Sequence, residues 1–170
     1  MTKKLLFVFL LALGLTFTGV CWADEAADKA VANLQKQIDK ATTSGNSDEQ
    51  RLVGNEYLNG HVSIQDTNKA IEWYEKSAAQ NNVKTMVALG NLYLTNPKVK
   101  QDYVKAREWF EKGAAFDDKW CLNRLGEIYE KGKGVEVDMA KALEYFKRAC
   151  ELKDSTGCNA VERVTAATAK

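Results

Sequence analysis

Few residues of this 170-residue chain could take part in chemistry. It has four cysteines, one histidine (His61), and one glycine-flanked lysine in the run 132–134. A nucleophilic Cys121 would need a base beside it, and His61 lies far away along the chain. A single histidine also argues against a zinc site. Gly-x-Gly with no strand before it is a weak signal for a phosphate-binding loop.

Carboxylate pairs are the remaining candidates for acid–base chemistry. Glu127 and Glu130, for example, lie at helical spacing, which a solvated helix face explains more simply than catalysis. The sequence therefore predicts no active site, no cofactor and no metal, and we expect the chain not to be an enzyme.

Composition indicates a folded protein of ordinary domain size. Apolar residues make up 45% and charged residues 28% of the chain, with 24 basic against 23 acidic side chains. A nearly neutral protein has little electrostatic attraction for phosphate. We therefore expect no nucleic-acid partner and no binding to an anionic membrane surface.

The first 23 residues have the pattern of a secretory signal peptide. Lys3 and Lys4 precede a largely apolar run, 5–20, and small residues stand at the −3 and −1 positions of a cut after Ala23. An uncleaved membrane anchor and a lipid-modified Cys21 are the alternatives. Cleavage predicts a periplasmic protein without stable membrane insertion.

A 36-residue period dominates the rest of the sequence. Seven positions recur in three copies: Gly54, Gly90 and Gly126; Tyr57, Tyr93 and Tyr129; Asp66, Asp102 and Asp138; Lys69, Lys105 and Lys141; Ala70, Ala106 and Ala142; Trp73, Trp109 and Tyr145; Tyr74, Phe110 and Phe146. Such a period is typical of stacked repeats.

Each unit is predicted to be a pair of helices. The glycine of the first helix allows close approach of a neighbour, and the aspartates are natural N-caps of the second helix. Ala70, Trp73, Tyr74 and Ser77 share one face of that second helix. Because one pair cannot bury this face alone, the units must stack into a right-handed α–α solenoid.

These motifs resemble the Sel-one-like repeats, relatives of the tetratricopeptide repeat, over about residues 48–162. The resemblance rests on Ala-Leu-Gly-Asn-Leu-Tyr at 88–93, Gly-Lys-Gly-Val at 132–135, Asp138 and the second-helix residues 141–146. It implies an all-α fold of three repeats with helical caps. The first two loops lack one or both glycines, which leaves their conformations open. The expected segments are 1–23, signal peptide; 24–47, capping helix and linker; 48–83, 84–119 and 120–155, repeats; 156–170, C-terminal cap.

The resemblance also implies a role for the cysteines. Residues 149–158 look like the bridged turn of a cysteine-rich, secreted subclass, which implies a Cys150–Cys158 disulfide. The alternative is two buried thiols. Cys121 would then be a buried structural thiol.

In related repeats the first helices line a concave surface that receives a protein partner. Carried over onto this chain, the partner-binding positions are Arg51, Asn55, Lys84, Asn91, Trp120, Asn123 and Glu127. We expect Trp73 and Trp109 to pack in the core. Trp120 has polar counterparts, Lys84 and Asp48, so it is either a packing adjustment or a binding anchor.

Three functions fit the resemblance. The first is an immunity protein that neutralises a toxic secreted effector, such as a type VI phospholipase. The second is a cell-envelope scaffold or regulator. The third is a penicillin-interacting hydrolase, against which the lack of Ser-x-x-Lys and Lys-Thr-Gly motifs argues.

Overall fold

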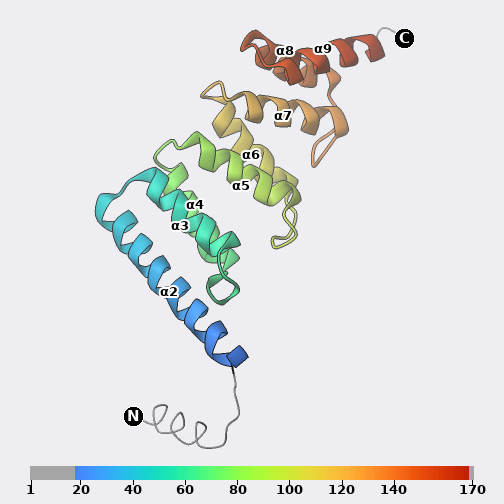
Figure 1. The fold of residues 1–170 in the computed structure, drawn as a ribbon. Coiled ribbons are helices and arrows are strands. Elements are labelled where there is room, and N and C mark those ends of the chain that lie inside the picture. The colour runs from blue at the N-terminus through green and yellow to red at the C-terminus, as the bar shows by residue number, and fades with distance from the viewer. Residues whose placement is uncertain (1–17, 169–170) are drawn as a thin grey trace, which may run out of the picture.

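The computed structural model describes residues 18–168, which are helical with short connections (Figure 1). The elements are α2 (Thr18–Ser44), α3 (Ser47–Asn59), the 3-10 helix η1 (Val62–Ile64), α4 (Thr67–Ala78), α5 (Val83–Thr95), α6 (Tyr103–Ala114), α7 (Lys119–Lys131), α8 (Met139–Glu151) and α9 (Ser155–Thr168). The lysines and most of the apolar run of the predicted signal peptide lie outside the described residues. Helix α2 passes through the predicted cleavage site.

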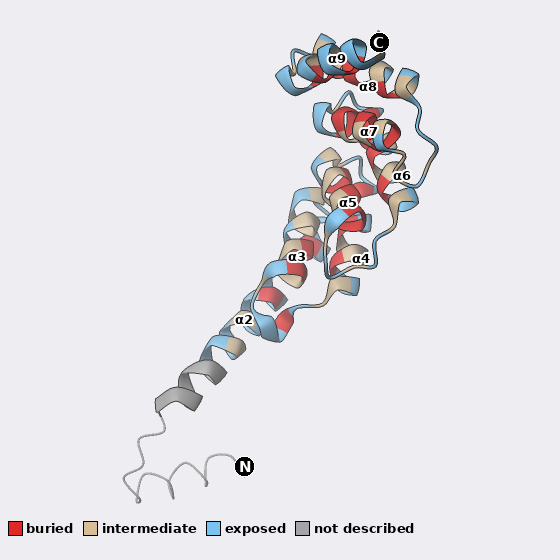
Figure 2. Cartoon of the chain, turned by 90° about the vertical axis from the view of Figure 1, so that its right-hand side faces the viewer, coloured by how far each residue is buried: buried red, intermediate tan, exposed pale blue. Residues whose placement is uncertain are grey.

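The helix pairs α3–α4, α5–α6 and α7–α8 stack in chain order, with α2 at one end and α9 at the other (Figure 1). This is the predicted α–α solenoid of three repeats. The first helix of each pair begins one residue before the expected repeat boundary. Buried residues lie along the facing sides of the helices (Figure 2).

Glycine–ring contacts hold each pair together. A Cβ on Gly54 would lie 2.5 Å from the ring of Tyr74, and one on Gly126 would lie 2.5 Å from that of Phe146. Gly90 meets Phe110 in the same way. These three rings are at most 2% exposed, so the glycines give the close approach that the sequence predicts.

Two sets of N-caps define where the helices begin. Asp66, Asp102 and Asp138 cap the second helices as predicted, each accepting the backbone N–H three residues on at 2.9–3.1 Å. A second set caps the first helices and α9, and sequence reasoning missed it: Asn46, Asn82, Asp118 and Asp154. Their own 36-residue spacing was the available signal.

The turn after each second helix also repeats. Gly45, Asn81, Asp117 and Lys153 have φ of 64°, 62°, 56° and 60°, a left-handed conformation that commonly ends helices. The end of α2 therefore matches the ends of α4, α6 and α8. The C-terminal part of α2 takes the place of the second helix of an incomplete repeat.

The loops within repeats differ in conformation, but each ends with the capping aspartate N–H donating to the tyrosine carbonyl of the first helix. The Nε2 of Gln65 donates to the Gly60 carbonyl at 2.8 Å, and that of Gln101 donates to the Leu94 carbonyl at 2.7 Å. In the third loop Gly132 and Gly134 adopt φ of 63° and 68° instead. In the first two loops, which have no left-handed glycine, a glutamine side chain donates instead to a backbone carbonyl at the end of the preceding helix.

A disulfide joins the last repeat to the C-terminal cap. Cys150 of α8 and Cys158 of α9 are bonded, which confirms the predicted pairing. Ala160 and Val164 of α9 pack with Phe146 in a small core cluster. Within residues 18–168, none of the helices is both long and apolar enough to cross a bilayer.

Candidate protein-binding surfaces

The predicted partner-binding residues come from the first helices α3, α5 and α7, and we call them the first-helix strip. Lys84 and Trp120 are exposed, whereas Asn123 is only 9% exposed. The remaining four, Arg51, Asn55, Asn91 and Glu127, are half-buried.

Trp120 is the exposed aromatic of the strip. It is 60% exposed, so it does not serve as core packing. The Arg124 guanidinium lies 5.4 Å from the centre of its ring, and the counterparts in the other repeats are Lys84 and Asp48. Tryptophan and arginine are both enriched among the residues that contribute most to the binding energy of protein interfaces.

Several polar residues of the strip already have partners within the chain. The Nδ2 of Asn123 donates to Asp154 at 3.0 Å, and Asn55 accepts from the Tyr74 hydroxyl at 2.6 Å. Glu127 pairs with Arg124 at 3.0 Å, and Arg51 pairs with Asp48 at 3.4 Å. Lys84, Asn91 and Trp120 are therefore the side chains of the strip most available to a partner.

The C-terminal helix α9 and its N-cap residue, Asp154, add charged groups near this surface. Hydrogen bonds from the Gly157 N–H and the Asn123 amide hold the pKa of the Asp154 carboxyl below its ordinary range. Arg163 of α9 forms a two-pronged ion pair with Glu130 of α7, one contact being 3.0 Å. The last repeat is thus bound to α9 by polar contacts as well as by the disulfide.

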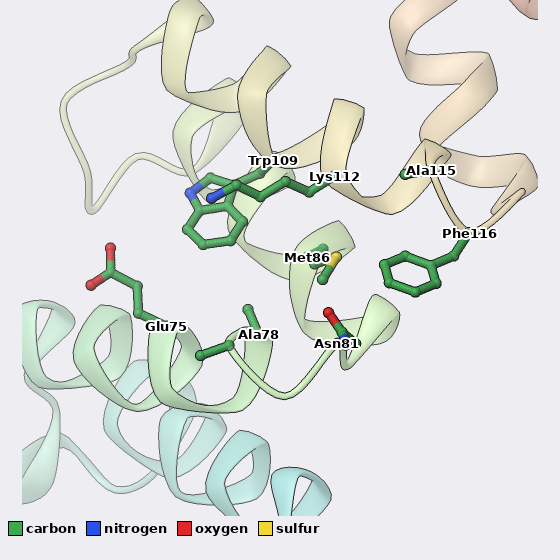
Figure 3. Close-up of a pocket in the computed structure, with 9 residues that line it drawn as sticks. Glu75, Ala78, Asn81, Met86, Trp109, Lys112, Ala115 and Phe116 are labelled. Carbon is green, nitrogen blue, oxygen red and sulfur yellow. The ribbon is translucent and has the colours of Figure 1, made fainter.

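A pocket of 420 Å³ lies between the second helices α4 and α6, and we call it the second-helix pocket (Figure 3). Met86 of α5 forms its buried floor, at 3% exposure, and Phe116 is 50% exposed. Trp109 is partly buried against the core, with the Lys112 ammonium 3.8 Å from the centre of its ring. The fully buried aromatic of this repeat is instead Phe110.

Cys121 is not placed for nucleophilic chemistry. Its side chain is fully buried, and its sulfur occupies the space that a Cβ on Gly113 would take. Burial, with the Asp118 carboxylate beside it, raises the pKa of the thiol far above its ordinary range. His61 is exposed at the start of η1, where its ring contacts Ser63.

Helix pairs that repeat every 36 residues and stack in chain order define a helical-repeat scaffold. The chain belongs to the Sel1 repeat family, whose model matches residues 50–82, 83–115 and 121–154. Sel1 repeat proteins are protein-binding modules, and the family is generally non-catalytic. No curated protein matches the chain.

Solved structures show the same fold. The protective antigen c5321 of uropathogenic Escherichia coli is 31% identical over 73% of this chain, with a TM-score of 0.66. A Sel1 repeat protein from Oxalobacter formigenes is 27% identical over 74%, with a TM-score of 0.65. The chain spans 26% and 51% of these two proteins. Cysteine rich protein B of Helicobacter pylori (hcpB), 23% identical over 75% of this chain and 93% of its own, shares the fold with a TM-score of 0.57.

Proposed function

We propose that this chain is an exported protein-binding module that works in the periplasm and receives a protein partner on the concave side, along the first-helix strip. The family supports protein binding. The Cys150–Cys158 disulfide supports an oxidising compartment, because such bonds persist mainly outside the reducing cytosol.

The observation that carries the proposal is the exposure of Trp120. Trp120 is 60% exposed, so a partner that covers its ring would remove a large apolar surface from water. Its counterparts Lys84 and Asp48 show that the fold does not require an aromatic side chain at this position.

Trp120→Lys tests the proposal, because it installs the residue that the second repeat carries. The partner is first isolated by quantitative co-purification from periplasmic extract and then titrated against both chains. We expect at least about 2 kcal/mol of lost binding, roughly thirtyfold, with unchanged helix content. Val62→Lys is the control, since Val62 is 78% exposed outside the strip. Equal affinities of Trp120→Lys and the parent chain would overturn the proposal.

Within this function we assign the chain to the neutralisation of a toxic secreted effector, such as a type VI phospholipase. The support is the family resemblance together with the proposed export. Co-production with a toxic effector encoded by a neighbouring gene should restore growth, and Trp120→Lys should abolish the protection. Binding to an envelope assembly protein without protection would instead establish the scaffold role.

A further inference from the structure

The second-helix pocket lies at the first junction between repeats, which we call the open junction. At the second, which we call the closed junction, an arginine side chain bridges the corresponding elements. The pocket lies between α4 and α6, at the junction of the first and second repeats (Figure 3). The junction of the second and third repeats is built from the corresponding residues 36 positions later. Comparison of the two junctions shows which side chain can fill the pocket.

An arginine closes the second junction. The Nη2 of Arg148 donates to the Ala114 carbonyl at 2.9 Å and to the Asp117 carboxylate at 2.6 Å, and its Nε donates to Asp117 at 3.1 Å. The guanidinium thus bridges the end of α6 from α8. Planar, multiple hydrogen bonding of this kind is what arginine provides and lysine does not.

The first junction lacks this closure. Lys112 stands at the position of Arg148, and its ammonium lies over the Trp109 ring instead. Asn81 replaces Asp117. The Ala78 carbonyl, which corresponds to that of Ala114, accepts the Asn81 N–H at 2.9 Å and no side chain of the described residues. Acceptor capacity therefore remains at the open junction.

The Glu75 carboxylate lies beside the pocket and lacks the ion pair that the corresponding residue of the second repeat makes. Glu111 of the second repeat pairs with Arg107 at 3.5 Å. Glu75 is the corresponding residue of the first repeat, but Ile71 occupies the position of Arg107. Glu75 therefore makes no ion pair among residues 18–168, and Figure 3 shows its carboxylate near the Trp109 end of the pocket.

We propose that the second-helix pocket binds an arginine side chain of a partner protein, which takes the place that Arg148 fills at the next junction. The guanidinium would donate to the Ala78 carbonyl and to the Asn81 side chain, with Glu75 supplying the opposite charge. Trp109 and Phe116 would cover its apolar and planar surfaces. This site lies between second helices and does not depend on the first-helix strip.

Lys112 sets the strength of the site. Its ammonium has the same sign as the bound guanidinium, so it lowers the affinity. Lys112→Met therefore tightens arginine binding several-fold while keeping an apolar chain against Trp109. A purely apolar occupant would gain no comparable electrostatic benefit from this substitution.

The test titrates the full chain with N-acetyl-arginine-N-methylamide and follows the Trp109 indole N–H by nuclear magnetic resonance. The matching lysine and leucine amides are the comparison probes. We expect weak binding of the arginine probe, with a dissociation constant on the order of 1–10 mM, and at least tenfold weaker binding of the other two.

Exchanging residues between junctions provides the decisive variants. Asn81→Asp with Lys112→Arg copies the closed junction and should abolish binding of the arginine probe. Lys76→Arg makes the same lysine-to-arginine change at Trp73 and should leave binding unchanged, and thermal melts confirm that each variant folds.

Three outcomes would overturn the proposal. They are a leucine probe that binds as well as the arginine probe, binding that survives in the closed variant, and the absence of binding by any probe. None of these outcomes bears on the strip, which is tested separately through Trp120. Loss of partner affinity in Trp120→Lys with intact arginine binding would show that the two surfaces are independent.

Discussion

At the scale of single residues, Cys121 shows how burial makes a potentially nucleophilic side chain unreactive. The Cys121 thiol lies against Gly113 and inside the main core cluster. Burial favours the neutral thiol, whereas nucleophilic attack needs the thiolate. An exposed cysteine beside a histidine would have a lower pKa and would react more readily.

Cys121 should therefore resist alkylation in the folded protein. Iodoacetamide at neutral pH should leave Cys121 unmodified in native buffer and modify it fully in guanidinium chloride, because unfolding removes the burial that raises its pKa. Peptide mass mapping reads this residue separately from the disulfide cysteines. Rapid modification in native buffer would contradict its buried placement.

Lys153 offers a second test at the residue scale. It adopts φ of 60° without being glycine, and the left-handed conformation costs an L-residue roughly 1–2 kcal/mol. Lys153→Gly should raise the free energy of unfolding by about 0.5–1 kcal/mol, after the greater entropy of glycine in the unfolded chain is subtracted. Lys147→Gly, within α8, should lower it by about 1 kcal/mol. Chemical denaturation measures both.

At the scale of helices, the glycine–ring contact decides how closely the two helices of a repeat approach. The three glycines occupy the first helix, and the three buried rings reach them from the second. The N-caps define where the same helices begin. The glycine–ring contact sets how closely the two helices pack.

Gly90→Ala should destabilise the protein by about 1–3 kcal/mol, because the added methyl group overlaps the buried Phe110 ring. The loss should outweigh the gain in helix propensity, roughly 1 kcal/mol. Phe110→Leu gives the methyl group room, so the double variant should lose less than the two single changes combined. If the free-energy losses of the two single variants simply add in urea denaturation, overlap with the Phe110 ring is not what destabilises Gly90→Ala.

Removal of the disulfide tests what holds α9 against α8. Cys150→Ser with Cys158→Ser should lower the free energy of unfolding by about 2.5 kcal/mol, the chain-entropy value for so short a loop. Reduction of the parent chain should give a similar loss. A change well below 1 kcal/mol would show that packing of Ala160 and Val164 already fixes α9.

At the scale of the whole molecule, each repeat contacts mainly its neighbours, so the caps determine how the solenoid ends. Helix α2 supplies the second-helix position of an incomplete repeat at one end. Helix α9 supplies a first-helix position at the other, with Glu162 where the complete repeats have glycine. Both helices thus cover a core surface of the repeat next to them.

Removal of the predicted signal peptide can be tested on the whole protein. Mass spectrometry of the protein from its native compartment should give a chain that begins at Asp24, because the signal peptide is expected to be cut after Ala23. An intact Met1 or a diacylated Cys21 would contradict export as a free periplasmic protein.

The repeat and the solenoid could be predicted from the spacing of residues along the chain, and the disulfide from the resemblance to a known family. Gly90, Asp102 and Phe110 perform local roles (close approach, capping and burial) that are the same in every copy, so their spacing was sufficient. The resemblance to cysteine-rich relatives identified Cys150 and Cys158.

Which side chains remain available to a partner could not be predicted from the sequence and depends on the folded structure. Asn123 and Trp120 were both expected on the binding surface, but Asn123 is held by Asp154 while Trp120 stays exposed. The second-helix pocket likewise depends on residues from α4, α5 and α6 together with the loop that follows α6. Whether a side chain is free depends on its neighbours across the repeat junction, and the spacing of residues along the chain does not carry that information.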